Sequence, residues 1–118
     1  MTEAATTERM KLIDLDDERY INRTRLAKLL AVPLMDVSVG TCYSKCLGYT
    51  RYGHQMIDRI GAIRDMQAYY TKMYMDNKSQ FLARHSEMYR DNALKYKARL
   101  ETCNMMLEAL TKGGDADG

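Results

Sequence analysis

Hydrophobic positions recur with a helical period through the last half of the chain. Between residues 55 and 112 the sequence has no proline and a single glycine, Gly61, and it has no Ile or Val after Ile63. Met, Tyr, Leu, Ala, Lys, Arg and Glu fill this stretch, and most of them are good helix formers. We therefore expect residues 55–112 to be largely helical.

Two apolar stripes run along this helical stretch. The first begins at Met56, and the second follows one heptad seam through the rest of the stretch, a pattern typical of helices that wind around each other. We expect these stripes to form an oligomer seam, made of Ile60, Ile63, Tyr70, Leu82, Tyr89, Tyr96, Leu100, Cys103, Leu107 and Leu110.

A polar cluster separates the two stripes. Asp76, Asn77 and Ser79 lie within Met75–Gln80, and all three residue types favour turns and helix N-caps. We expect the chain to fold back here, as an antiparallel helical hairpin with arms of roughly 20 and 32 residues. The alternative is one uninterrupted helix of roughly 58 residues, about 87 Å long.

The first half of the chain has a less regular pattern. We expect a flexible N-terminal arm over 1–20, disordered over 1–8 and then either a short helix or extended. A helical region over 21–54 would begin with a helix at 23–32, capped by Asn22 or Thr24 and ended by Pro33. Residues 34–40 fit a short strand or a turn into another helix, 42–53 fit a helical turn and a loop, and 113–118 fit a disordered tail. The predicted fold class is all-α, with domains at 1–20, 21–54, 55–112 and 113–118.

Composition adds one expectation, which concerns the size of the hydrophobic core. Leu, Ile, Val and Phe are scarce, whereas ten Met and nine Tyr supply apolar bulk, and the net charge is only +2. Such a chain forms only a small hydrophobic core of its own, and chains of this kind commonly bury more apolar surface by associating with another chain. We therefore expect a non-catalytic helical protein that self-assembles or acts as an adaptor in a larger complex, with itself or another protein as partner and no membrane.

The sequence shows no catalytic constellation. His54 and His85 are the only histidines, and neither lies beside a serine or acid in a dyad pattern. The set Cys42, Cys46, His54 and His85 matches no zinc spacing, and no glycine-rich phosphate loop occurs. We expect no enzymatic activity, no cofactor and no metal. The odd cysteine count and the absence of a signal-like start or an apolar span indicate a cytoplasmic protein.

DNA binding is the alternative function. Residues 25–38 have helix-turn-helix spacing, with the small Ala27 ten positions before Val37. The segment Leu34–Gly40 would make a poor recognition helix, because it lacks Arg, Lys, Gln and Asn. In this alternative the chain is a small DNA-binding regulator or packaging protein, dimerised by the helical hairpin. Its expected nucleic-acid contacts are the basic residues Arg23, Arg25, Lys28, Lys45 and Arg51.

Overall fold

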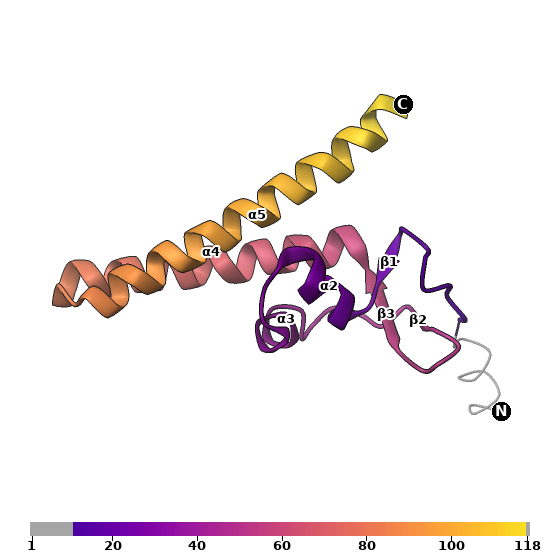
Figure 1. The fold of residues 1–118 in the computed structure, drawn as a ribbon, viewed down its shortest axis with the longest axis horizontal. Coiled ribbons are helices and arrows are strands. Elements are labelled where there is room, and N and C mark those ends of the chain that lie inside the picture. Colours follow the sequence, from indigo (N-terminus) through magenta and orange to yellow (C-terminus); the bar gives the residue numbers. More distant parts are fainter. Residues whose placement is uncertain (1–10, 118) are drawn as a thin grey trace. The chain divides into compact units, whose positions relative to one another are not determined.

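The computed structural model describes the backbone of residues 11–117 and the side chains of residues 11–112. It divides into two compact units, unit 1 (Met1–Ala62) and unit 2 (Ile63–Gly118), which are described separately below. The chain is mostly helical, as predicted, and two long helices pack against each other (Figure 1). The disorder expected for residues 1–8 lies outside the described residues.

Unit 1 contains a small antiparallel sheet that the residue pattern does not predict. Its strands are β1 (Tyr20–Ile21), β2 (Gly48–Tyr49) and β3 (Gln55–Asp58), in the order β1-β3-β2. The prediction that helix begins at Gln55 is therefore wrong, because α4 begins only at Arg59. The Asp58 carboxylate accepts a hydrogen bond of 2.7 Å from the Gly61 N–H, as an N-cap residue does, and this marks the change from strand to helix.

The described N-terminal segment is extended and joins the sheet. Its Leu12 pairs in parallel with Tyr49. The Ile13 N–H donates to the Tyr49 carbonyl, the Tyr49 N–H donates to the Lys11 carbonyl, and both bonds are 2.8 Å long. Of the two alternatives for this segment, the extended one is correct for the described residues, because sheet hydrogen bonds satisfy its backbone.

Two short helices follow β1. Helix α2 (Arg23–Leu30) begins at Asn22, whose side chain accepts a 2.8 Å hydrogen bond from the Arg25 N–H. Left-handed Ala31 (φ 56°) ends α2 two residues earlier than predicted. The reversal at Ala31 comes before Pro33, which is instead the N-cap of α3 (Leu34–Gly40). The strand alternative for residues 34–40 is therefore wrong.

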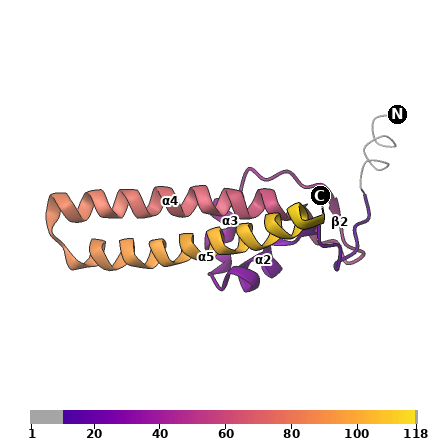
Figure 2. The ribbon, with the colours of Figure 1, turned by 90° about the horizontal axis from the view of Figure 1, so that it is seen from above.

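Unit 2 is a helical hairpin. Helix α4 (Arg59–Arg84) enters it from unit 1, and α5 (Glu87–Asp117) runs antiparallel to α4 (Figure 2). The predicted hairpin is confirmed, but the predicted turn at Met75–Gln80 is wrong. That segment is helical, and Asn77 donates its side-chain N–H to the carbonyl of Met73 instead of capping a new helix. The chain turns at left-handed His85 (φ 56°), whose N–H donates to the Phe81 carbonyl.

The later turn changes where one predicted seam residue lies. Leu82 belongs to α4 and not to the second arm, and its side chain is 63% exposed. At the other end of the hairpin, α5 extends into the segment 113–118, where a disordered tail was expected and where side chains are not described. In the described part of the chain, none of the helices combines the length and the apolar character needed to cross a membrane.

Candidate nucleic-acid interface

Helices α2 and α3 form a packed pair, here called the helix-turn-helix unit (residues 23–40). Leu26 and Val37 are fully buried, and Ala27 and Leu30 are nearly so. Ala27 and Val37 are the two positions whose spacing predicted this motif. Their burial at the contact between α2 and α3 fixes how α3 is presented.

Arg23 holds the end of α3 in place. Its Nε donates to Thr41 Oγ1 (2.9 Å), one guanidinium nitrogen donates to the Thr41 carbonyl (2.8 Å), and the other donates to Gln55 Oε1 (3.0 Å). Thr41 is fully buried and donates its hydroxyl to the Val37 carbonyl. One arginine therefore links α2, the end of α3 and β3, and its guanidinium is committed inside unit 1.

Arg25, another predicted contact, is tied to the N-terminal segment. It donates to the Leu15 carbonyl (2.8 Å) and lies 3.5 Å from the Asp16 carboxylate. Nearby, hydrogen bonds from Arg19 lower the pKa of Asp17 to about 2. The remaining predicted contacts, Lys28, Lys45 and Arg51, are exposed.

A β-hairpin made of β2 and β3 follows the helix-turn-helix unit. Its turn is closed by Thr50, whose N–H donates to the His54 carbonyl and whose hydroxyl accepts from the His54 N–H. Gly53 has a φ of 85°, a conformation that suits glycine. The tip is exposed, and the Arg51 guanidinium lies 5.2 Å from the centre of the Tyr52 ring. This tip therefore presents a cation and an aromatic ring side by side.

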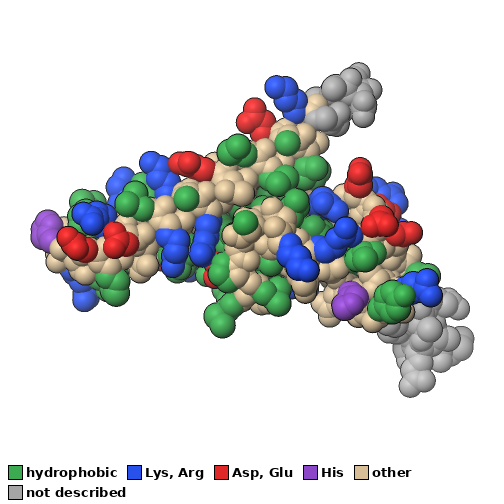
Figure 3. Space-filling view, in the orientation of Figure 1, with side chains coloured by type: hydrophobic (Ala, Val, Ile, Leu, Met, Phe, Trp, Pro, Cys, Tyr) green, Lys and Arg blue, Asp and Glu red, His purple; other side chains and the backbone are tan. Residues whose placement is uncertain are grey.

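The outward side of α3 is mostly apolar, with Ser38 as its exposed polar residue. Leu34 is 47% exposed, Met35 76% and Val39 52%, and Tyr43, just beyond the helix, is 98% exposed. These four residues are here called the α3 face. Figure 3 shows hydrophobic side chains gathered where α3 lies in Figure 1. A signal for this face exists in the sequence, because a seven-residue helix that turns only Val37 inward must expose its other apolar side chains.

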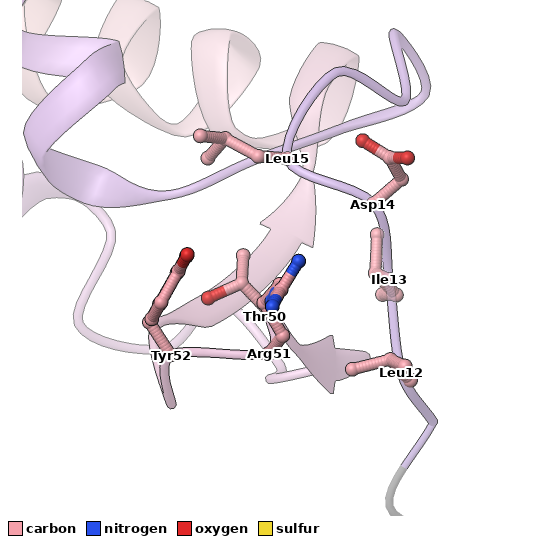
Figure 4. A pocket seen from close by; sticks show the side chains of 7 residues that line it. All are labelled: Leu12, Ile13, Asp14, Leu15, Thr50, Arg51 and Tyr52. Atoms are coloured by element: carbon pink, nitrogen blue, oxygen red, sulfur yellow. The ribbon is translucent and has the colours of Figure 1, made fainter.

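A pocket of about 430 Å³ separates the N-terminal segment from the turn of the β-hairpin (Figure 4). The N-terminal segment contributes Leu12, Ile13, Asp14 and Leu15, and the turn contributes Thr50, Arg51 and Tyr52. Apolar side chains predominate in the lining, and the pocket holds no concentration of titratable groups that would suggest chemistry.

The cysteines and histidines do not converge on one site in the described part of the chain. Cys42 is exposed beyond the end of α3, and the thiol of Cys46 donates to the Gly48 carbonyl (3.2 Å). Cys103 is buried in the helical hairpin, and burial raises its pKa to about 11. No group of three or more His, Cys, Asp or Glu side chains among the described residues could hold a metal ion.

The predicted seam residues lie largely between the two long helices of one chain. In unit 2, Ile63, Tyr70, Cys103 and Leu107 are buried, and the ring of Tyr70 lies 6.0 Å from that of Tyr96. A hydrogen bond from Gln67 to Asn104 also joins α4 to α5. The half-buried members are Ile60, Tyr89, Tyr96, Leu100 and Leu110. That these seam residues also join two chains into an oligomer stays a prediction.

Comparison of the chain with known families, with curated proteins and with solved structures found no match in any of the three.

Proposed function

We propose that this chain is a non-catalytic DNA-binding protein in which unit 1 contacts duplex DNA and the helical hairpin carries self-association. The observation that carries the proposal is the β-hairpin that follows the helix-turn-helix unit, with Arg51 and Tyr52 at its exposed tip. Sequence alone favours assembly over DNA binding. The β-hairpin, which the residue pattern does not predict, reverses that order.

Helix-turn-helix proteins place their second helix in the major groove, while other elements contact the phosphate backbone. Here α3 is that second helix, and its outward side chains are free of packing against α2. Arginine, lysine and tyrosine are common phosphate ligands, and the β-hairpin tip offers two of these residue types. In this proposal α3 is the groove element and the β-hairpin tip is the backbone element, and the two come from adjoining parts of the chain.

The local charge supports the same partner. Between residues 21 and 57 the sequence has five basic residues and a single acid, Asp36, although the whole chain is nearly neutral. Arg23 and Arg25 are engaged within unit 1, so the phosphate contacts assigned here are Lys28, Lys45 and Arg51. Three contacts predict modest affinity with a moderate dependence on salt.

Fluorescence anisotropy with a labelled duplex of about 30 base pairs, titrated over a range of salt concentrations, tests this proposal. The logarithm of the binding constant should fall with the logarithm of salt concentration, with a slope of about −0.9 per phosphate contact. Arg51→Ala and Lys45→Ala should each make this slope shallower by about one unit. Arg64→Ala, an exposed arginine on α4, is the matched control and should leave the slope unchanged. Failure to bind any duplex at about 50 mM salt would overturn the proposal.

Self-association is the second candidate function, and exposed apolar side chains on unit 2 favour it. Met75 (56% exposed) and Leu82 lie seven residues apart on α4, and Leu94 (59%) and Met105 (71%) lie eleven apart on α5. Both separations return to nearly the same side of a helix. Each long helix therefore has two exposed apolar side chains on one side, which a second copy, or another protein of a larger complex, could cover.

Light scattering tests the self-association. A dimer has twice the chain mass of 13.6 kDa, and it suits a DNA-binding protein, since two copies can read two half-sites. Leu94→Asp should reduce the mass to that of one chain by placing a charge in the contact. A wild-type chain that stays at 13.6 kDa at high concentration would remove self-association and leave the DNA proposal standing.

A further inference from the structure

The α3 face lacks the side chains that most recognition helices use to contact DNA bases. Residues on recognition helices usually identify a base by paired hydrogen bonds, from Arg or Lys to guanine and from Asn or Gln to adenine. Helix α3 contains none of these four residue types, and its most exposed apolar side chains are Met35 and Val39. The inference below rests on the proposed DNA binding.

We propose that α3 recognises the 5-methyl groups of pyrimidines in the major groove, so that the chain prefers thymine-rich duplexes. The thymine methyl is the apolar feature that the standard base pairs present in that groove. Met35 and Val39 are four residues apart and lie side by side on one helix face. Their spacing of about 5–6 Å allows each to contact a methyl group, and the flexible methionine adapts to small differences in position.

Charge favours DNA over a protein as the occupant of this face. Exposed Lys28 precedes α3 in the chain, and exposed Lys45 and Arg51 follow it. Asp36, the acid within α3, is half-buried and not among the exposed side chains. Cations thus flank this apolar face on both sides in the sequence, and the major groove of DNA offers methyl groups on its floor and phosphates along its walls.

Replacement of thymine by uracil tests the inference, because it removes the methyl group and keeps the base pairing. The probes are a duplex of alternating dA and dT, about 24 base pairs long, and the same duplex with uracil at each thymine position. Burial of one methyl-sized group corresponds to about 0.8 kcal/mol, or roughly a fourfold change in affinity. The uracil duplex should therefore bind about fourfold more weakly for each contacted methyl group.

A second pair of probes separates methyl contact from DNA shape. An alternating duplex of dG and dC, with and without 5-methylcytosine, gains the same methyl group on a different base pair. The methylated duplex should bind more tightly than its unmethylated match. The same direction of change in both pairs ties the preference to the methyl group, since the two duplexes differ in stiffness and groove width.

Three variants locate the contact. Met35→Ala and Val39→Ala should bring the ratio of thymine to uracil affinity towards one while retaining phosphate-driven binding. Arg51→Ala should weaken both duplexes by the same factor and leave that ratio unchanged. Met88→Ala, an exposed methionine on α5 (57%), is the matched control and should change neither affinity.

The outcomes separate this inference from the DNA proposal beneath it. Equal affinity within both probe pairs would overturn methyl recognition and leave DNA binding intact. No binding to any of the four duplexes would overturn both. A thymine-to-uracil affinity ratio of one, together with a lower molar mass of Met35→Ala in light scattering, would overturn methyl recognition. It would indicate that the α3 face contacts a second copy of the chain.

Discussion

The packing that presents α3 can be tested with two identical substitutions on one helix. Val37 is fully buried against α2, whereas Val39, two residues later, is 52% exposed. Replacing either valine by alanine removes the same two methyl groups and lowers β-branching equally. The two variants therefore differ almost only in burial.

The expected cost of Val37→Ala follows from that burial. Two buried methyl groups account for about 1.6 kcal/mol, and the cavity left behind adds about 1 kcal/mol, so the total is about 2–3 kcal/mol. Val39→Ala should stay within about 0.5 kcal/mol of the wild type. In this account Val39→Ala weakens DNA binding without loss of stability, and Val37→Ala lowers stability.

Hydrogen exchange measured by mass spectrometry on peptides covering α2 and α3 is the suitable assay, because it reports unit 1 separately from the helical hairpin. Val37→Ala should speed exchange in these peptides by about 30- to 150-fold, and Val39→Ala should leave it nearly unchanged. Equal effects of the two substitutions, or no effect of Val37→Ala, would refute the packing described for the helix-turn-helix unit.

Three further predictions concern other parts of the fold. In Gly48→Ala the new methyl group would lie 2.6 Å from Ile13 Cδ1, so we expect the free energy of unfolding to fall by about 1–3 kcal/mol. Hydrogen exchange in the N-terminal segment should become faster, and unchanged exchange would contradict this prediction. Because the pKa of Cys103 is raised to about 11 from an ordinary 9, its contribution to stability is complete below pH 9 and is lost as the pH rises towards 11. Thermal melts from pH 8 to 11 should show this alkaline loss reduced in Cys103→Ala, and identical pH profiles would argue against it. Leu107→Asp places a charge at a position only 8% exposed, so it should lower the free energy of unfolding by at least about 3 kcal/mol and lower the oligomeric state. Met105→Asp, at an exposed position, is the control for melting temperature. An unchanged melting temperature and molar mass of Leu107→Asp would contradict the predicted seam.

The long helices could be predicted from the sequence because their signal is periodic and local. Glycine, proline and β-branched residues are nearly absent from residues 63–112, and the structure is helical there apart from a short turn. The turn itself could not be placed. Asp76, Asn77 and Ser79 have the chemistry of a turn, but Asn77 bonds within the helix, while the actual reversal uses a left-handed histidine that has no strong turn preference.

The sheet depends on contacts between residues that are far apart in the sequence. Such contacts also decide which basic residues are engaged inside unit 1. Strands β1 and β2 are two residues each, too short for an alternating pattern, and β1 pairs with β3 across more than thirty residues. In the same way, Arg23 looks like an available cation in the sequence, and only the positions of Thr41 and Gln55 show that it is engaged. The helix-turn-helix spacing was visible in the sequence, and the β-hairpin on which the DNA-binding proposal rests was not.

Hydrogen exchange of the free chain and of the chain with a saturating alternating dA/dT duplex tests the DNA-binding account most directly. The account predicts slower exchange in the presence of DNA in the peptides that cover α3 and the β2–β3 tip, with α4 and α5 little changed. Slower exchange confined to the helical hairpin, or no difference between the two samples at low salt, would contradict it.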